Sequence, residues 1–513
     1  MSAIKRLAGQ TAIYGIPSIL GRVLGYLLVP LYTHVFKPDA YGTVNVFYAY
    51  ASLLKVILTY GMETAFFRFT EHEERKESVY STALLSLLVT SILFLIPVTI
   101  WSGAIARWID YPKSGNYVKW FAWILALDAI AAIPFARLRS QNKAFRFAGV
   151  NMAGIMTNIG LNLFFLVLCP YLIKHNSHNF ISTVIHFIYN PHWGIEYIFI
   201  SNLIGSIVTL VLLMPQIAEA RRKINPSLWK KMFFYAFPLL FAGMAGIVNE
   251  TFDRLLLRYL LPGSAAHASF QVGVYAACYK ISILMTIFIQ AYKYAAEPFF
   301  FAQAKEKNAT ETYASIMNYF IIIVSVIFLA TMVYLDDFIL PLFLRNKAYW
   351  TGRGVIPVLM LANLFLGVYY NLSIWYKLTS KTSWGAWLSL IGAVITLILN
   401  FIWIPLSSKH LIFGYYGSAW ATFICYATMM ILSYVIGQKY FPVKYNLVKF
   451  FGYIGLALFL YYITTIISIE HFALKVSFHT LILITFGAVV LAIERPPVLM
   501  KLLFTGNQRR THN

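Results

Sequence analysis

The stretch Tyr14–Phe69, YGIPSILGRVLGYLLVPLYTHVFKPDAYGTVNVFYAYASLLKVILTYGMETAFFRF, is the part of the chain that decides its fold. It holds two apolar segments, each near the roughly 20 residues that cross a bilayer as a helix. Arg22 lies inside the first segment, Lys55 lies inside the second, and Glu63 follows eight residues later. A charge at the bilayer centre costs about 2.5–3.5 kcal/mol, so these side chains are expected to face a polar interior.

The rest of the chain repeats this apolar pattern. Of its 513 residues, 60% are hydrophobic and only 12% are charged, a composition typical of a polytopic membrane protein. The apolar runs are continuous, which predicts helices instead of the alternating strands of a barrel. Fourteen spans are predicted, near 11–34, 41–66, 80–103, 116–138, 148–170, 196–215, 233–261, 270–301, 313–335, 352–376, 384–404, 414–437, 448–467 and 476–494.

The distribution of Lys and Arg predicts the topology. With the N-terminus inside, 25 of the 41 basic residues fall in cytoplasmic segments and 12 on the opposite side. This bias favours both termini in the cytoplasm and an even number of spans. The formal net charge of +22 is then explained largely by basic loops against anionic lipid, and nucleic-acid binding is not expected. Three isolated cysteines in predicted spans indicate neither a metal site nor a disulfide framework.

An internal repeat divides the chain. Three weak matches recur in the same order: Tyr41–Phe69 with Val272–Gln303, Arg139–Phe164 with Thr379–Ile402, and Gly194 with Gly417. They predict two pseudo-symmetric six-helix lobes, residues 1–222 and 223–440, with two further helices and a cytoplasmic tail in 441–513. Two similar lobes around a cleft are the architecture of an alternating-access transporter.

Embedded charges in the first half are the first candidates for a site. Arg22 shares its helix face with small and polar residues, and a purely structural arginine is the alternative interpretation. Lys55 lies on a face with Tyr and Ser residues and is the stronger candidate for a functional cation. Asp128 is a lone acid in the fourth span, expected either to pair with one of the cations or to couple to a cation. Glu63 is expected to act as a structural partner.

The seventh and eighth spans carry the corresponding charges of the second half. Glu250, Arg254 and Arg258 follow at intervals of four, so Glu250 and Arg254 are expected to pair and to leave Asp253 and Arg258 for other partners.

In the eighth span, Lys293 and Glu297 share a face while Lys280 points roughly 140° away. We expect Lys280 to face the cavity and Lys293 to pair with Glu297, although the opposite assignment of the two lysines remains open. The excess of cations over acids in the first two spans predicts an anionic ligand, with phosphate or pyrophosphate as the obvious group.

The chain also resembles a known family. The segments that carry the resemblance are Lys5–Gly15, Leu28–Thr33, Tyr41-Gly42, Asp253-Arg254, Glu297-Pro298-Phe299 and Gly417. They are similar to the polysaccharide-exporter (oligosaccharide flippase) family of the multidrug/oligosaccharidyl-lipid/polysaccharide exporter superfamily.

The resemblance implies a fourteen-helix, two-lobed flippase for undecaprenyl-pyrophosphate-linked sugar units in the bacterial cytoplasmic membrane. Related lipid II flippases have essential basic residues in their first, second and eighth helices, and Arg22, Lys55 and Lys280 occupy those spans here. They are the expected pyrophosphate ligands. Asp128, Asp253, Arg254, Arg258 and Lys293 are further candidates for the cavity or for ion coupling, and Glu63 and Glu297 are expected to be structural latches.

The sequence also suggests binding partners for this protein and two alternative functions. The predicted partners are the lipid-linked oligosaccharide, membrane lipids, and glycosyltransferases and a polymerase of the same pathway. We expect a monomer without a cofactor, with proton or sodium coupling left open. A multidrug antiporter of the same superfamily is one alternative, but its first helix usually carries an acid where this chain has Arg22. A polytopic glycan polymerase or transferase is the other, but the chain has no DxD motif and no large outer loop, so an enzyme is not expected.

Overall fold

Helices form most of the described structure. The computed structural model describes residues 20–21, 23–73, 75–175, 188–220, 223–304, 306–406 and 414–494, and these ranges contain no strand. Within them, 13 helices are long and apolar enough to cross a membrane, and a shorter apolar helix covers Val23–Val35. These segments correspond in order to the fourteen predicted spans. The prediction of an all-helical polytopic membrane protein is therefore confirmed.

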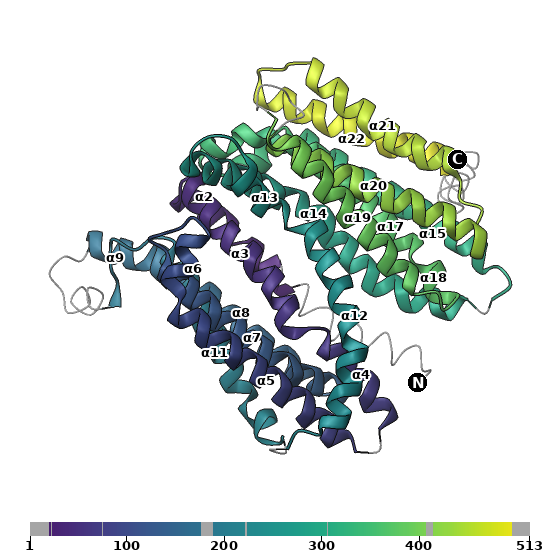
Figure 1. The fold of residues 1–513 in the computed structure, drawn as a ribbon. Helices are drawn as coiled ribbons and strands as arrows, with labels where there is room; N and C mark the ends of the chain where they lie inside the picture. Colours follow the sequence, from purple (N-terminus) through teal and green to yellow (C-terminus); the bar gives the residue numbers. More distant parts are fainter. Residues whose placement is uncertain are drawn as a thin grey trace, which may run out of the picture.

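The first half of the chain forms one bundle, shown in purple and blue in Figure 1. Its core is the group α5, α7, α8 and α11, with α3 and α4 packed against α7. We call the helices α2–α11 the first bundle. They are α2 (Val29–Val35), α3 (Pro38–Thr59), α4 (Met62–His72), α5 (Lys76–Ile100), α6 (Ser102–Trp108), α7 (Gly115–Ser140), α8 (Ala144–Leu163), α9 (Cys169–His175) and α11 (Glu196–Ala218).

The second bundle, shown in teal and green, is built around α14, α17 and α20. Helix α12 (Pro226–Glu250) leads into it and packs on α3 and α4 as well as on α19. The other members are α13 (Asp253–Leu260), α14 (Ala265–Gln303), α15 (Ala309–Val333), α16 (Leu340–Phe343), α17 (Val355–Leu372), α18 (Ile374–Leu378), α19 (Ser383–Trp403) and α20 (Tyr415–Tyr440).

Two further helices, α21 (Leu447–Ile466) and α22 (Phe472–Glu494), lie outside the second bundle against α15. Polar contacts fasten α22 near both of its ends. Lys475 donates to Asp337 at 2.7 Å, and Asn318 donates to Glu494 at 2.8 Å. The pair thus has the appended position that the sequence predicts. The boundaries of the lobes at residues 222 and 440 stay predictions.

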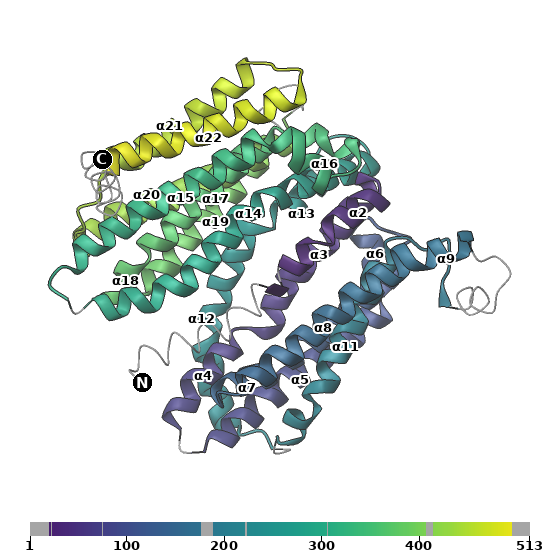
Figure 2. The same cartoon turned by 180° about the vertical axis from the view of Figure 1, so that it is seen from behind.

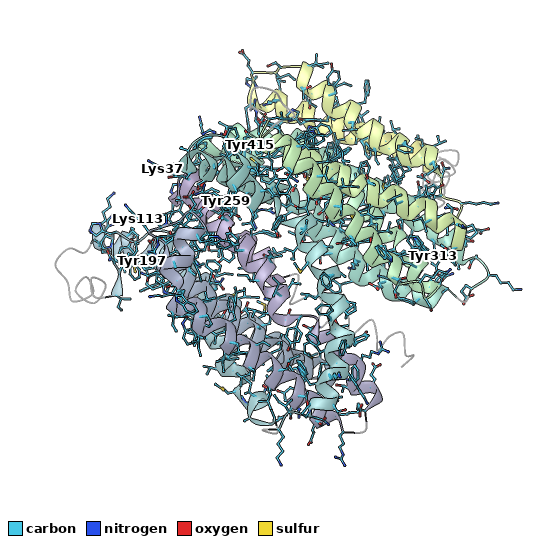
Figure 3. All side chains as sticks on the ribbon, in the orientation of Figure 1. Lys37, Lys113, Tyr197, Tyr259, Tyr313 and Tyr415 are labelled. Atoms are coloured by element: carbon cyan, nitrogen blue, oxygen red, sulfur yellow. The ribbon has the colours of Figure 1, made fainter. Side chains whose placement is uncertain are left out.

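The two bundles meet at one end and diverge toward the other, as the two opposite views show (Figures 1 and 2). We call the end that holds Asp110 and Tyr259 the joined end, and the end that holds Arg139 and Lys377 the open end. In Figure 3, Tyr259 lies near Lys37 where the bundles meet, while Tyr313 lies at the opposite end of the second bundle. The molecule is therefore V-shaped.

Close backbone packing of α3 against α14 holds the joined end. Gly42 and Gly273 face each other there, and a Cβ added to either would overlap the main-chain carbonyl of the other helix. Two hydrogen bonds also cross from one bundle to the other. Thr33 donates to the Phe343 carbonyl at 2.8 Å, and Tyr349 donates to the Phe36 carbonyl at 2.9 Å.

Two predicted spans are interrupted. The second span breaks at Tyr60 and Gly61, both in the left-handed region, so that α3 ends at Thr59 and α4 begins at Met62. The seventh span, predicted as one helix over 233–261, breaks after Glu250, and α13 begins at Asp253. This second break changes which charged side chains can meet.

Candidate functional site

A cavity of about 890 Å³ lies on the inner face of the first bundle and extends to α14 of the second. We call it the first chamber. Its walls come from α3, α4, α7, α8 and α11, the first apolar segment with α2, and Lys280 of α14. Five charged side chains line it: Lys55, Glu63, Asp128, Arg139 and Lys280. The first chamber is thus a large polar cavity between otherwise apolar helices.

Lys55 and Asp128 meet in this chamber as an ion pair. The Lys55 ammonium on α3 lies 3.1 Å from Asp128 Oδ2 on α7, and Ser206 on α11 donates to Oδ1 at 2.9 Å. Three helices therefore converge on one carboxylate. Both charged side chains remain accessible, with 52% of the Lys55 side chain and 33% of the Asp128 side chain exposed. Of the two roles that the sequence left open for Asp128, the structure shows the pairing with a cation.

Glu63 is engaged within its own bundle. Its carboxylate forms an ion pair with Arg139 at the end of α7, and the Arg139 guanidinium lies 5.0 Å from the centre of the Phe67 ring. Glu297 in the second bundle repeats this arrangement, because it accepts a hydrogen bond from Lys377 of α18 at 2.7 Å. Each glutamate thus ties two helices of the same bundle at the open end. This supports the expected structural role, which remains a prediction.

The charge of the first chamber follows from these pairs. Asp128 offsets Lys55 and Glu63 offsets Arg139, whereas Lys280 has no ion-pair partner within the described residues. The Lys280 ammonium lies 5.5 Å from the centre of the Tyr26 ring. The described lining therefore has a net charge of +1, carried by Lys280. The sequence left open which cation Asp128 would pair with; the structure shows that it is Lys55, which reduces the excess of cations expected from the first two spans.

A second cavity of about 460 Å³ lies in the second bundle, and we call it the second chamber. Lys293 lines it, with its ammonium 4.6 Å from the centre of the Tyr370 ring. Lys280 and Lys293 are therefore on different sides of α14, as the roughly 140° between them requires. Each faces its own chamber. The carboxylate of Glu297, expected to pair with Lys293, instead accepts from Lys377.

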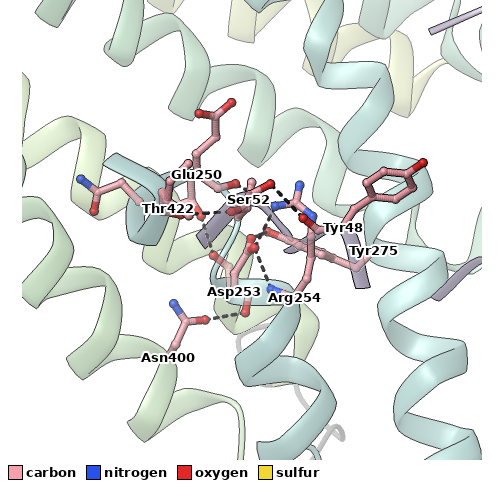
Figure 4. Close-up of polar contacts among 12 residues, drawn as sticks. Tyr48, Ser52, Glu250, Asp253, Arg254, Tyr275, Asn400 and Thr422 are labelled. Carbon is pink, nitrogen blue, oxygen red and sulfur yellow. Dashed lines mark hydrogen bonds and ion pairs between the residues drawn. The ribbon is translucent and has the colours of Figure 1, made fainter. Parts of the chain in front are cut away.

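The charged cluster at the start of α13 differs from the expected pairing. Arg254 Nη1 donates to Asp253 Oδ1 at 3.0 Å, and Tyr275 donates to Asp253 Oδ2 at 2.6 Å (Figure 4). Glu250 contributes only its backbone carbonyl to Arg254, at 2.7 Å. The predicted Glu250–Arg254 side-chain pair was wrong because the helix breaks between the two residues. Arg254 and Asp253 are buried, and the Glu250 carboxylate is exposed in the second chamber.

Arg258 lies outside both chambers, at the joined end. Its guanidinium donates to Asp110 Oδ2 of the first bundle at 2.8 Å and to the Tyr111 hydroxyl at 2.9 Å. The hydroxyls of Tyr50 and Tyr259 lie 2.6 Å apart beside this pair. Sequence reasoning missed Asp110 because it treated the residue as part of an ordinary loop. Together these contacts link the two bundles.

Two further residues complete the comparison with the prediction. Arg22 lies outside the described residues. The predicted fourth span ends at residue 138 and leaves Arg139 outside it, but the structure places Arg139 in α7 and in the wall of the first chamber. The signal that could have found it is the internal repeat, in which the segment that begins at Arg139 matches the segment just after Lys377. The described residues hold no group of three or more His, Cys, Asp or Glu side chains that could bind a metal ion.

Comparisons with known proteins agree with this architecture. Residues 7–113 and 180–302 match the family model described as polysaccharide biosynthesis protein. No curated protein sequence matches the chain. The resemblance to the polysaccharide-exporter family is thereby confirmed over these segments.

Solved structures extend the likeness to the fold. A lipid II flippase MurJ in an inward closed conformation aligns with a TM-score of 0.65 at 14% identity, over 93% of this chain and 98% of its own. An inward-facing multidrug resistance transporter of the MATE family has a TM-score of 0.61 at 14% identity, over 81% and 93%. An outward-facing MATE transporter gives 0.57 at 14%, over 86% and 98%. The chain thus shares its overall fold with these flippase and MATE transporter structures.

Proposed function

We propose that this protein is a flippase that moves undecaprenyl-pyrophosphate-linked oligosaccharide units across the bacterial cytoplasmic membrane. The observation that supports this most directly is the first chamber, in which Lys55 of one bundle and Lys280 of the other line the same cavity of about 890 Å³. A pyrophosphate is a multivalent anion, and charge-assisted hydrogen bonds from ammonium groups are the usual way to bind one. Lysines act here as point charges, without the bidentate geometry of arginine.

The proposal gives each site residue a role. Arg22, Lys55 and Lys280 bind the pyrophosphate, while the polyprenyl tail stays in lipid. With the topology that the basic residues favour, both termini are cytoplasmic and the open end faces the cytoplasm. The substrate enters there, the bundles rock, and the contacts of the joined end separate to release the headgroup outside.

Ion coupling and partners remain part of this proposal. Asp128 is the first candidate for proton or sodium coupling, because the movement of an anion onto Lys55 would free its carboxylate. Glu63 is the second, although Arg139 already neutralises it. The transporter works as a monomer and receives its substrate from the glycosyltransferases of the pathway. A polymerase then uses the exported units.

Replacement of the cations tests the proposal in cells. In a strain that lacks the chromosomal gene, Lys280→Ala, Lys55→Ala and Arg22→Ala are each expected to abolish the surface glycan while folded protein remains in the membrane. Lys347→Ala, an exposed lysine at the joined end, is the matched control and should restore the glycan fully. Normal export by all three cavity variants would refute the cationic site.

A multidrug transporter is the alternative function, because a structure with the same fold is one. The net positive charge of the described chamber lining disfavours cationic drugs, because like charges repel. Drug sensitivity of the deletion strain separates the two functions. The flippase proposal expects unchanged sensitivity to cationic dyes and a loss of surface glycan.

A further inference from the structure

We propose that the second chamber binds the sugar next to the pyrophosphate, and that its chemistry selects an uncharged residue there. This inference rests on the proposed function, because it places the sugar relative to a pyrophosphate held in the first chamber. Helices α12, α14, α17 and α20 form most of the second chamber, and none of its residues is used by the pyrophosphate site described above.

The lining of the second chamber fits a polyhydroxylated ring. Its walls include six tyrosines, which offer apolar ring faces and polar hydroxyls at once: Tyr26, Tyr279, Tyr369, Tyr370, Tyr376 and Tyr426. The side chains of Tyr26 and Tyr370 are partly exposed, whereas the other four tyrosines are buried. Such a surface can pack on the C–H faces of a pyranose and hydrogen-bond to its hydroxyls.

Among the polar side chains of the chamber, the Glu250 carboxylate and the Gln290 amide have no hydrogen-bond partner within the described residues. A carboxylate is acceptor-only, and an amide both donates and accepts, so together they match the donor and acceptor pattern of sugar hydroxyl and N-acetyl groups. Glu250 is exposed and Gln290 is half-buried, so both side chains are accessible to a ligand. A bound sugar would supply these missing partners.

The charges around the second chamber balance. Its lining holds Glu250, Lys293 and Lys377, and Glu297, just outside the lining, pairs with Lys377 at 2.7 Å, so two acids face two bases. The first chamber, by contrast, retains the uncompensated charge of Lys280. A charge-balanced chamber gives no net electrostatic gain to an acidic sugar. An uncharged residue, such as an N-acetylhexosamine, is therefore the favoured occupant.

The two chambers adjoin at Lys280 and Tyr26. Lys280 lines the first chamber, Tyr26 lines the second, and the ammonium lies 5.5 Å from the ring centre. A ligand whose pyrophosphate lies at Lys280 can thus extend past Tyr26 into the second chamber. The volume of about 460 Å³ is also in the range of ordinary ligand pockets, roughly 300–1,000 Å³.

A larger side chain at Gly246 on α12 would fill part of the second chamber without removing an existing contact. Gly246 lines the second chamber, and a Cβ added there meets no atom within 4 Å. Gly246→Phe therefore places a ring in the empty space and also replaces a poor helix former. Gly246→Ala tests the backbone change alone. Gly452→Phe is the matched control, because Gly452 is exposed on α21 with equally open space around it.

The experiment compares three probes that share one lipid: farnesyl pyrophosphate, the same lipid with N-acetylglucosamine on the pyrophosphate, and the same lipid with glucuronic acid there. Their binding to the purified full chain is measured in nanodiscs. We expect wild-type protein to bind the N-acetylglucosamine probe about tenfold more tightly than the other two, the factor that about 1.4 kcal/mol provides. Gly246→Phe should lose this tenfold gain and bind farnesyl pyrophosphate unchanged, and Gln290→Leu should reduce the gain.

The outcomes separate the inference from the proposed function. If folded Gly246→Phe binds the N-acetylglucosamine probe as tightly as wild type, or if wild type shows no gain from the uncharged sugar, the second chamber does not bind the sugar. If wild type binds none of the probes, or if Lys280→Ala binds all three normally, the pyrophosphate site itself is refuted and the inference fails with it. Gly246→Ala and Gly452→Phe should match wild type throughout.

Discussion

The ammonium of Lys55 on α3 lies 3.1 Å from the carboxylate of Asp128 on α7, within the first chamber. Ser206 holds the other oxygen of this carboxylate at 2.9 Å. One of the cations proposed to bind the substrate is therefore already occupied by an internal anion. A pyrophosphate that reaches Lys55 must compete with Asp128, which makes this acid a determinant of substrate affinity.

The first prediction concerns this competition. Asp128→Asn should increase the affinity for farnesyl pyrophosphate up to about fivefold, because a half-exposed ion pair contributes about 0–1 kcal/mol. Binding to purified protein in nanodiscs measures the effect. Asp336→Asn is the control, since it removes an acid paired with the exposed Arg353 outside both chambers. Weaker binding by Asp128→Asn than by wild type would show that Asp128 supports the anion site instead of competing for it.

The contact between Arg258 and Asp110 leads to a second prediction. Arg258→Ala should open the joined end, because it removes charge-assisted hydrogen bonds between the bundles, each worth about 1.5–3 kcal/mol. Spin labels at the exposed positions Lys113 and Lys347 would report the distance between the bundles. The variant should populate a longer distance that is rare in wild type.

The control for this measurement is Arg107→Ala. Arg107 is an exposed arginine near the same end of the first bundle, and its loss should leave the distance distribution unchanged. Identical distributions for wild type and Arg258→Ala would mean that the Arg258–Asp110 pair does not hold the joined end closed.

The crossing of α3 and α14 gives a third prediction. Gly42→Ala and Gly273→Ala should each destabilise the structure by about 1–3 kcal/mol or more, because the added methyl group overlaps a main-chain carbonyl that cannot move away easily. The apparent melting temperature in detergent measures this loss. Gly103→Ala should have little effect, since its Cβ would meet no atom within 4 Å. Equal stability of all three variants would contradict the close crossing.

The paired glutamates give a fourth prediction. Glu63→Gln alone should destabilise the first bundle, because it leaves Arg139 without its anionic partner. In a double-mutant cycle with Arg139→Gln, the coupling should be about 0.5–1 kcal/mol for this partly exposed pair. The Glu297–Lys377 pair should give a similar value. Zero coupling in both cycles would exclude the latch role, and loss of export without loss of stability would assign Glu63 to ion coupling.

The sequence predicted the spans well, because each needs about 20 apolar residues whatever its neighbours are. It also predicted correctly that Lys280 and Lys293 cannot share one cavity, since helix geometry fixes the angle between them. It did not reveal the break between Glu250 and Asp253, where no Gly or Pro interrupts the apolar run. The expected pairing of Glu250 with Arg254 failed for that reason.

Tertiary neighbours explain the other differences. Asp128 meets Lys55 only because α7 packs against α3, and Asp110 meets Arg258 only because the bundles join at that end. Neither contact leaves a signal in the local sequence. Arg139 was placed outside the fourth span because hydropathy ends that span one residue before it, whereas α7 continues to Ser140. Span ends are the least certain part of such a prediction, and here the end of the fourth span contains Arg139, which lines the first chamber.

The leaflet distribution of the lipid-linked glycan tests the central claim most directly. Intact spheroplasts of the deletion strain are treated with periodate, which does not cross the membrane and oxidises glycan in the outer leaflet alone. Strains that express wild-type protein or Lys280→Arg, which keeps the charge, should show oxidised lipid-linked glycan. The strain that expresses Lys280→Ala should retain this glycan unoxidised in the inner leaflet. Equal oxidation in the Lys280→Ala, wild-type and deletion strains would contradict the account.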